Sequence, residues 1–275
     1  KIEREMAKRG HTEALGMYSE LMGWNNPECP RIWPWIYRTH TATPPFTFVR
    51  NPYFWAVDPE GNQLPYIDQV QIDVKSNEMI SFAAATGEIT FQGRHIRPED
   101  YTLLMSGREG RGYDIYHWYP TFASNYTVFP NMNRRIEPGD PVTRNKHTVL
   151  NDVRFRQALS LAIDRGTIIE TEYYGITEPA QIDPGPASPF RHPKLRNAFI
   201  EYDPDRANAL LVDMGLTNRD REGYRTFADG TRMQFYINTS GWTGPGPAQF
   251  LIDDWKAVGV RVVLRDRTRR LFGTE

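Results

Sequence analysis

The sequence is poor in cysteine, lacks long apolar runs and carries almost no net charge. With one cysteine, Cys29, among 275 residues, the chain can form no internal disulfide. No stretch reaches the roughly 20 apolar residues that a membrane-spanning helix needs. The net charge of −1 gives no electrostatic reason to expect a nucleic-acid partner. Residues 1–10 are charged and helix-like, unlike a secretory signal, so either the protein is cytoplasmic or its start has been removed.

The usual catalytic and metal-binding motifs are also missing. The six histidines form neither an HExxH motif nor a Cys/His zinc spacing. Gly107, Gly110 and Gly112 match neither a P-loop nor a dinucleotide fingerprint. Asp253 and Asp254 are adjacent in a predicted helix and point to different faces, whereas a glycosidase needs two carboxylates facing one bond. We therefore expect no catalytic residue, no metal and no cofactor; a carbohydrate-active enzyme with dispersed carboxylates stays the alternative.

Aromatic rings and prolines are what the sequence has in quantity, with 14 Tyr, 14 Phe, 7 Trp and 21 Pro. Rings at strand ends, where Gly or Pro shapes the loop, can stack on a ligand. Trp118 and Tyr119 end a predicted strand, and Trp242 lies in a loop after another strand, where open α/β sheets bind ligands. We predict that these three residues contact a ligand, although packing of each ring under its own loop fits as well. Trp33 and Trp35 are weaker candidates.

Local patterns predict a mixture of helices and strands. The last third is the clearest, because strand, helix and strand follow one another within about 33 residues and should form a parallel βαβ unit. This order favours the α/β class. Helices are predicted at residues 1–22, 78–86, 97–106, 152–165, 204–214 and 247–257. Strands are predicted at residues 46–57, 66–74, 88–92, 113–118, 126–129, 233–237 and 260–264. Loops are predicted at residues 23–46, 134–147 and 175–200.

Four stretches resemble the family 5 extracellular solute-binding proteins, which include dipeptide, oligopeptide and nickel binders. The first joins residues 50–55 (RNPYFW) to residues 64–68 (LPYID) and is similar to the family's "RNPYYW…PYID" segment. The second, residues 87–93 (GEITFQG), resembles "sGeiDf", with Thr90 where the family usually has Asp. Physically, the first reads as a strand end, a turn and a return strand.

The other two stretches lie further along the chain. Residues 151–165 (NDVRFRQALSLAIDR) are similar to the family's "D.rVRqAlslAiDr" helix and are the most specific match. Residues 203–215, followed by Asp229-Gly230 and the βαβ unit, resemble "DP.rAk.lL.eaGl…dG…L..iGi.v", but the family's acidic "DGDG" is degraded at 218–223. The four stretches follow the family's order and spacing.

The resemblance implies a periplasmic-binding-protein-like fold of type II, similar to cluster C, whose two lobes close on a ligand around a hinge. Family members are longer, so the fold is expected to be incomplete in this chain. Residues 1–125 are then assigned to the C-terminal part of the first lobe and its hinge-proximal sheet. Residues 126–275 are assigned to the second lobe, incomplete at its C-terminus.

The function that the resemblance implies is solute capture by an ABC importer outside the cytoplasmic membrane. The expected ligand is an oligopeptide or an oligosaccharide, with a slight preference for sugar from the aromatic content, and the expected partner is a membrane permease. We expect a periplasmic or extracellular monomer, with or without a lipid anchor, and no enzyme activity. A sensor subunit that presents bound ligand to a membrane protein is a further alternative. The resemblance transfers no particular binding residue to this segment.

Overall fold

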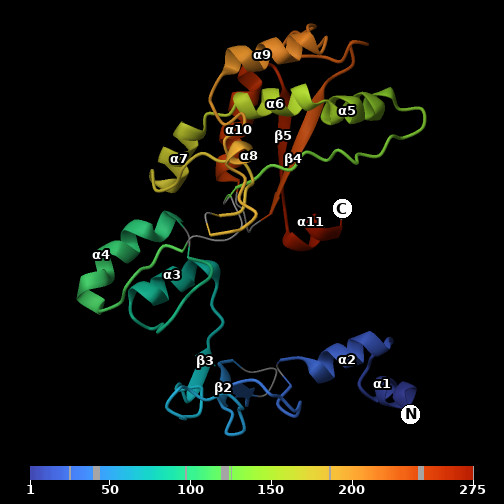
Figure 1. Ribbon diagram of the computed structural model, residues 1–275. Helices are drawn as coiled ribbons and strands as arrows, with labels where there is room; N and C mark the ends of the chain where they lie inside the picture. The colour runs from blue at the N-terminus through green and yellow to red at the C-terminus, as the bar shows by residue number, and fades with distance from the viewer. Residues whose placement is uncertain are drawn as a thin grey trace. The chain divides into compact units, whose positions relative to one another are not determined.

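The computed structural model describes residues 1–24, 26–39, 44–96, 98–118, 124, 126–185, 187–240 and 245–274. The chain forms two compact units, Lys1–His95 and Ile96–Glu275, which Figure 1 shows in blue to teal and in green to red. Each unit has its own sheet and its own helices. The assignment of residues 1–125 and 126–275 to two lobes stays a prediction.

The first unit is built on a small antiparallel sheet in the order β1–β2–β3. Because side chains alternate along a strand, the register of the three strands places apolar rings on one face, with Phe48 of β2 opposite Tyr37 of β1 and Val70 of β3. Tyr37 is fully buried there. The elements of this unit are α1 (Ile2–Lys8), α2 (Ala14–Met22), β1 (Trp35–Tyr37), β2 (Phe46–Arg50), β3 (Gln69–Ile72) and α3 (Asn77–Ala85).

The second unit contains the predicted βαβ arrangement, with β4 and β5 parallel. The strands pair from Gln234 opposite Arg261 to Ser240 opposite Arg267. Its elements are η1 (Pro98–Asp100), α4 (Tyr101–Arg111), α5 (Pro141–Asn151), α6 (Val153–Leu161), α7 (Arg165–Tyr173), α8 (Pro193–Arg196), α9 (Pro204–Asp213), β4 (Gln234–Ser240), α10 (Gly246–Ala257), β5 (Arg261–Arg267) and α11 (Arg269–Thr274).

The hydrophobic core of the second unit lies between its helices and one face of β4 and β5. Helices α6 and α9 pack against each other, and α10 packs on β5 (Figure 1). Phe155 of α6 contacts Phe235 of β4 with ring centroids 5.4 Å apart. The fully buried core residues include Phe155, Ala158, Leu161, Ala207, Leu211, Met233 and Val258.

Several predictions about helices were wrong in detail: α7 was not predicted, and α8 lies within the loop expected at 175–200. The helix expected at 1–22 is two helices, α1 and α2, because Gly10 adopts a φ of +76°, in the left-handed region that ends helices. The loop expected at 134–147 includes the first part of α5, whose start is capped by Asp140 through a hydrogen bond from Val142 N. Pro141 occupies the first turn, where it costs no hydrogen bond.

Three predicted strands are absent from the described residues, namely 88–92, 113–118 and 126–129. Alternating side chains permit a strand, but a strand forms only where a second strand supplies backbone partners. Tyr126 and Val128 instead pack against the core from an irregular segment. The predicted strand 46–57 is shorter than expected, because β2 ends at Arg50.

Candidate ligand-binding surfaces

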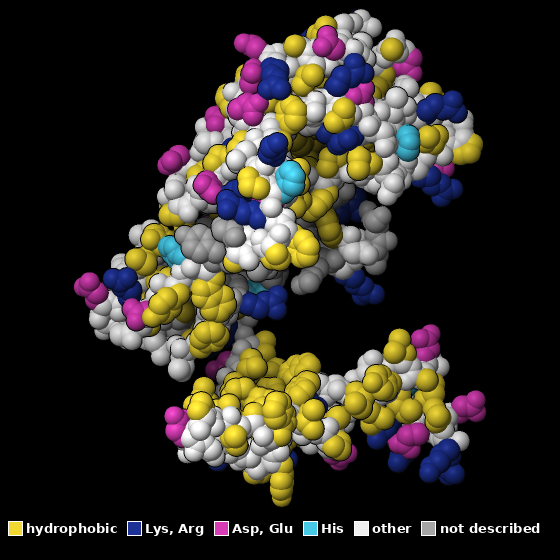
Figure 2. Space-filling model, in the orientation of Figure 1, with side chains coloured by type: hydrophobic (Ala, Val, Ile, Leu, Met, Phe, Trp, Pro, Cys, Tyr) yellow, Lys and Arg dark blue, Asp and Glu magenta, His cyan; other side chains and the backbone are white. Residues whose placement is uncertain are grey.

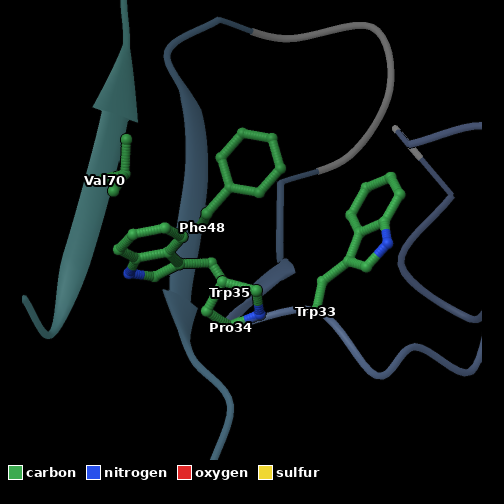
Figure 3. Close-up of a pocket in the computed structure, with 5 residues that line it drawn as sticks. All are labelled: Trp33, Pro34, Trp35, Phe48 and Val70. Atoms are coloured by element: carbon green, nitrogen blue, oxygen red, sulfur yellow. The ribbon is translucent and has the colours of Figure 1, made fainter. Parts of the chain in front are cut away.

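An apolar pocket of about 170 Å³ opens on the sheet of the first unit. It is lined by Trp33, Pro34, Trp35, Phe48 and Val70, which are labelled in Figure 3. Trp35 belongs to β1, Phe48 to β2 and Val70 to β3. Phe48 and Val70 are direct neighbours across β2 and β3. The two tryptophans that were the weaker candidates therefore share one pocket.

Hydrogen bonds hold the pocket walls in place. Trp35 Nε1 donates to the Ile67 carbonyl at 3.0 Å, which fixes the plane of the indole. Asn51, only 2% exposed, donates from Nδ2 to the Trp33 carbonyl at 2.9 Å and to that of Arg31 at 3.3 Å. These bonds tie the segment before β1 to the end of β2.

The chemistry of the pocket suits one apolar or aromatic group. Its walls carry no charged side chain, and the Arg31 guanidinium lies 4.9 Å from the centre of the Trp33 ring at the rim. Trp33 is 50% exposed, so its ring is available for stacking. Sites for drug-sized ligands occupy roughly 300–1,000 Å³, so this pocket can anchor one side chain or ring of a larger ligand.

The three predicted ligand contacts belong to the second unit. Trp118 is 71% exposed, whereas Tyr119 and Trp242 lie outside the described residues. The strand predicted before Trp118 did not form. The connection that carries Trp242 runs from the end of β4 at Ser240 to the start of α10 at Gly246, as predicted.

The carboxyl end of β4 is tightly packed. Thr239 and Ser240 are buried, and Thr239 Oγ1 donates to Asp266 Oδ1 of β5 at 2.9 Å. This hydroxyl is therefore already used inside the sheet. Burial and this hydrogen bond fix the end of β4 within the sheet.

Within the residues that the structure describes, no group of three or more His, Cys, Asp or Glu side chains is arranged to hold a metal ion. Over the same residues, no helix is long and apolar enough to cross a membrane. Sequence reasoning missed Phe48 and Val70 as pocket residues, because only the pairing of β1, β2 and β3 brings them to Trp33 and Trp35.

Solved structures similar to this chain are solute-binding proteins. An oligopeptide-binding protein OppA is 36% identical, covers 99% of this chain and has a TM-score of 0.62, while the chain covers 43% of it. A periplasmic binding protein from Agrobacterium fabrum, solved in complex with stachyose, is 19% identical and has a TM-score of 0.66. The match covers 90% of this chain and 38% of the Agrobacterium chain. The fold is thus the mixed α/β fold of type II periplasmic binding proteins, as predicted.

Comparison with characterised sequences gives the same family. The periplasmic alpha-galactoside-binding protein of Rhizobium meliloti is 26% identical over 78% of this chain, and a probable ABC transporter-binding protein of Deinococcus radiodurans is 24% identical over 78%. The chain spans about a third of the length of these relatives, 32% and 36% respectively. The model of the family "Bacterial extracellular solute-binding proteins, family 5 Middle" matches residues 34–272, so this chain belongs to that family.

Proposed function

We propose that the protein containing this chain is the solute-binding component of an ABC importer and that it captures an oligopeptide between two lobes. The observation that carries the choice of peptide is the 36% identity to an oligopeptide-binding protein across 99% of the chain. The proposed partner is a membrane permease, which receives the ligand outside the cytoplasmic membrane. The protein works as a monomer that does not alter its ligand.

An oligosaccharide is the second candidate. It is favoured by the alpha-galactoside-binding relative and by exposed indole rings such as Trp118, since the faces of aromatic rings stack on sugars. This candidate predicts that rings provide most of the contact, whereas a peptide uses main-chain hydrogen bonds as well.

We propose that Trp118, Tyr119 and Trp242 contact this ligand from the second unit. Trp118 already exposes most of its surface to solvent, and the loop of Trp242 starts from the end of β4. Burying an indole against a ligand removes a large apolar area from water.

The test is a thermal-shift screen of the full-length protein against dipeptides, longer peptides and α-galactosides. A ligand at 100 times its dissociation constant that binds only the folded state adds about 2.7 kcal/mol of stability. This should raise the melting temperature by a few degrees in a protein of this size. A shift with peptides and none with sugars supports the proposal; the reverse moves oligosaccharide to first place.

Variants then test the contact residues. Trp118→Ala and Trp242→Ala should each weaken binding about tenfold, equivalent to about 1.4 kcal/mol. Trp55→Ala is the matched control, because Trp55 is similarly exposed, at 75%, but belongs to the first unit and has no proposed role. Equal affinities of all three variants would refute the contact assignment. Mass spectrometry of the recovered ligand tests for turnover, and a hydrolysed ligand would favour the enzyme alternative.

A further inference from the structure

Two cationic side chains of the second unit lie over one aromatic ring, that of Tyr236 on β4, and a third acts on one of them. The Arg265 guanidinium of β5 lies 3.4 Å from the centre of this ring. The Lys146 ammonium of α5 lies 5.6 Å from the same centre and 5.9 Å from that of Phe235. Arg134, just before α5, is close enough to act electrostatically on Lys146. We call Arg134, Lys146 and Arg265 the cationic cluster.

The cationic cluster has more positive than negative charge around it. Within the described part of the chain, none of its three members forms an ion pair. Lys146 is only 9% exposed, and Arg134 Nε is buried without a hydrogen-bond partner among these residues. Buried lysines are rarely left without a partner, and a buried N–H without one costs free energy.

Two arginines that neighbour the cluster in sequence are paired with acids. Arg135, next to Arg134, pairs with Glu137 at 3.2 Å. Arg261, on the same strand as Arg265, pairs with Asp220 at 3.1 Å and with Glu222 at 3.0 Å. Unlike Arg135 and Arg261, no member of the cationic cluster is paired with an acid in the described residues.

The electrostatics of Lys146 agree with this geometry. Burial lowers the pKa of Lys146, and the charge of Arg134 lowers it further. Asp140 acts in the opposite direction, and Arg265 adds to the lowering. The carboxylate of Asp140 already accepts a hydrogen bond from Val142 N as the helix cap of α5. An additional anion at the cluster would stabilise all three cations.

We propose that the cationic cluster is a binding site for a phosphate group, either free phosphate or a phosphate monoester. The anion would lie beside the Tyr236 ring, accept hydrogen bonds from the edge of the Arg265 guanidinium, and offset the positive charge of Lys146 and Arg134. Stacking on Tyr236 leaves the N–H edge of Arg265 free for two parallel hydrogen bonds to an oxyanion. The site does not depend on the identity of the transported solute.

Charge favours phosphate over a carboxylate. Three cations and the nearby Asp140 leave two positive charges, which match a phosphate dianion better than a single carboxylate. A tetrahedral oxyanion can also accept hydrogen bonds from donors in several directions, whereas a carboxylate accepts them in one plane. The Tyr236 hydroxyl is held by Gln234 Nε2 at 2.8 Å, which keeps the ring in place.

The test is isothermal titration of the chain with inorganic phosphate, with phenyl phosphate and with acetate, all at the same ionic strength. We expect saturable binding of at least one phosphate compound and none of acetate at equal concentration. The comparison of free phosphate with its phenyl ester shows which form the site prefers. Arg134→Gln and Arg265→Gln should each weaken binding about tenfold or more, with folding checked by circular dichroism.

Arg135→Gln is the matched control, because Arg135 is adjacent in sequence and equal in charge but pairs with Glu137. This variant should bind phosphate as the unmodified chain does. Equal weakening by Arg135→Gln would mean general attraction to a basic surface and would overturn the proposal. So would acetate binding as tightly as phosphate, or no saturable binding of either phosphate compound.

Discussion

Arg225 provides the sharpest test of what holds the second unit together. Its side chain is 3% exposed and has no carboxylate partner in the described residues. Instead, it donates from Nε to the Val258 carbonyl at 2.9 Å, from Nη1 to the Leu216 carbonyl, and from Nη2 to Asn208 Oδ1 at 2.8 Å. One guanidinium thus connects the end of α10, the segment after α9 and α9 itself.

We predict that Arg225→Met destabilises the second unit by about 3–5 kcal/mol. Each buried acceptor left without a partner costs about 1–3 kcal/mol, and two buried carbonyls and one part-buried amide oxygen are left. Part of this loss is recovered, because the variant no longer buries a charge, whose burial lowers the pKa of Arg225. For a unit of this size, about 2–4 °C is expected per kcal/mol, so the melting temperature should fall by roughly 6–20 °C.

The assay is urea and thermal unfolding followed by tryptophan fluorescence and circular dichroism. Arg221→Met is the matched control, because Arg221 is exposed and lies four residues away; it should change stability by no more than about 0.5 kcal/mol. Arg225→Lys retains the charge but cannot reach three acceptors in three directions, so its stability should lie between the two. An Arg225→Met variant within about 1 kcal/mol of the unmodified chain would refute this reasoning.

Three further predictions concern a turn, a helix cap and a core ring. Tyr66→Phe should raise the pKa of Asp58 from about 2 towards its usual 3.8, measured by NMR titration, because the Tyr66 hydroxyl is the strongest cause of the lowering. Since the folded-state pKa is depressed, the stability that Asp58 contributes should be present above pH 4 and lost as pH falls through about 2. An unchanged pKa of Asp58 in the Tyr66→Phe variant would contradict this explanation. Asp203→Ala should destabilise α9 by about 1 kcal/mol, measured by urea unfolding, because Asp203 caps that helix, with Asp205→Ala as a control of smaller effect. Trp255→Phe should lower the free energy of unfolding by about 1–3 kcal/mol in the same assay, because the Leu159 carbonyl loses its 2.9 Å hydrogen bond from Trp255 Nε1. No change would mean that the core closes around phenylalanine.

Sequence patterns predicted the helices and strands with clear end signals. The start of α9 was predictable from Asp203 followed by Pro204, and the start of α6 from Asp152, whose carboxylate accepts a hydrogen bond from Arg154 N. The same signal was present at Asp140-Pro141, yet α5 was missed. Its buried stripe consists of Thr143, Lys146, Val149 and Leu150, so half of it is polar. The hydrophobic period on which helix prediction depends was therefore weak.

The candidate sites were predictable only in part, because each depends on contacts between distant segments. Trp33 and Trp35 were weak candidates until the pairing of β2 with β3 brought Val70 to the same pocket. The cationic cluster joins residues 134, 146 and 265, and its unpaired charge can be recognised only once its neighbours are known. In the sequence, Arg265 is one of four arginines within residues 265–270, and nothing in that pattern distinguishes it from the others.

The segments that identify the family cannot by themselves determine the solute. The most specific match, residues 151–165, contains α6, whose Phe155, Ala158 and Leu161 are fully buried in the core. Such positions report packing, because a ligand cannot reach them. The relatives named for alpha-galactosides and for oligopeptides share this family, so their difference must come from exposed positions. Exchanging Trp118, which is 71% exposed, should therefore alter ligand affinity with little loss of stability, whereas a substitution within α6 should do the reverse. A change of ligand class caused by a core substitution in α6 would contradict this division.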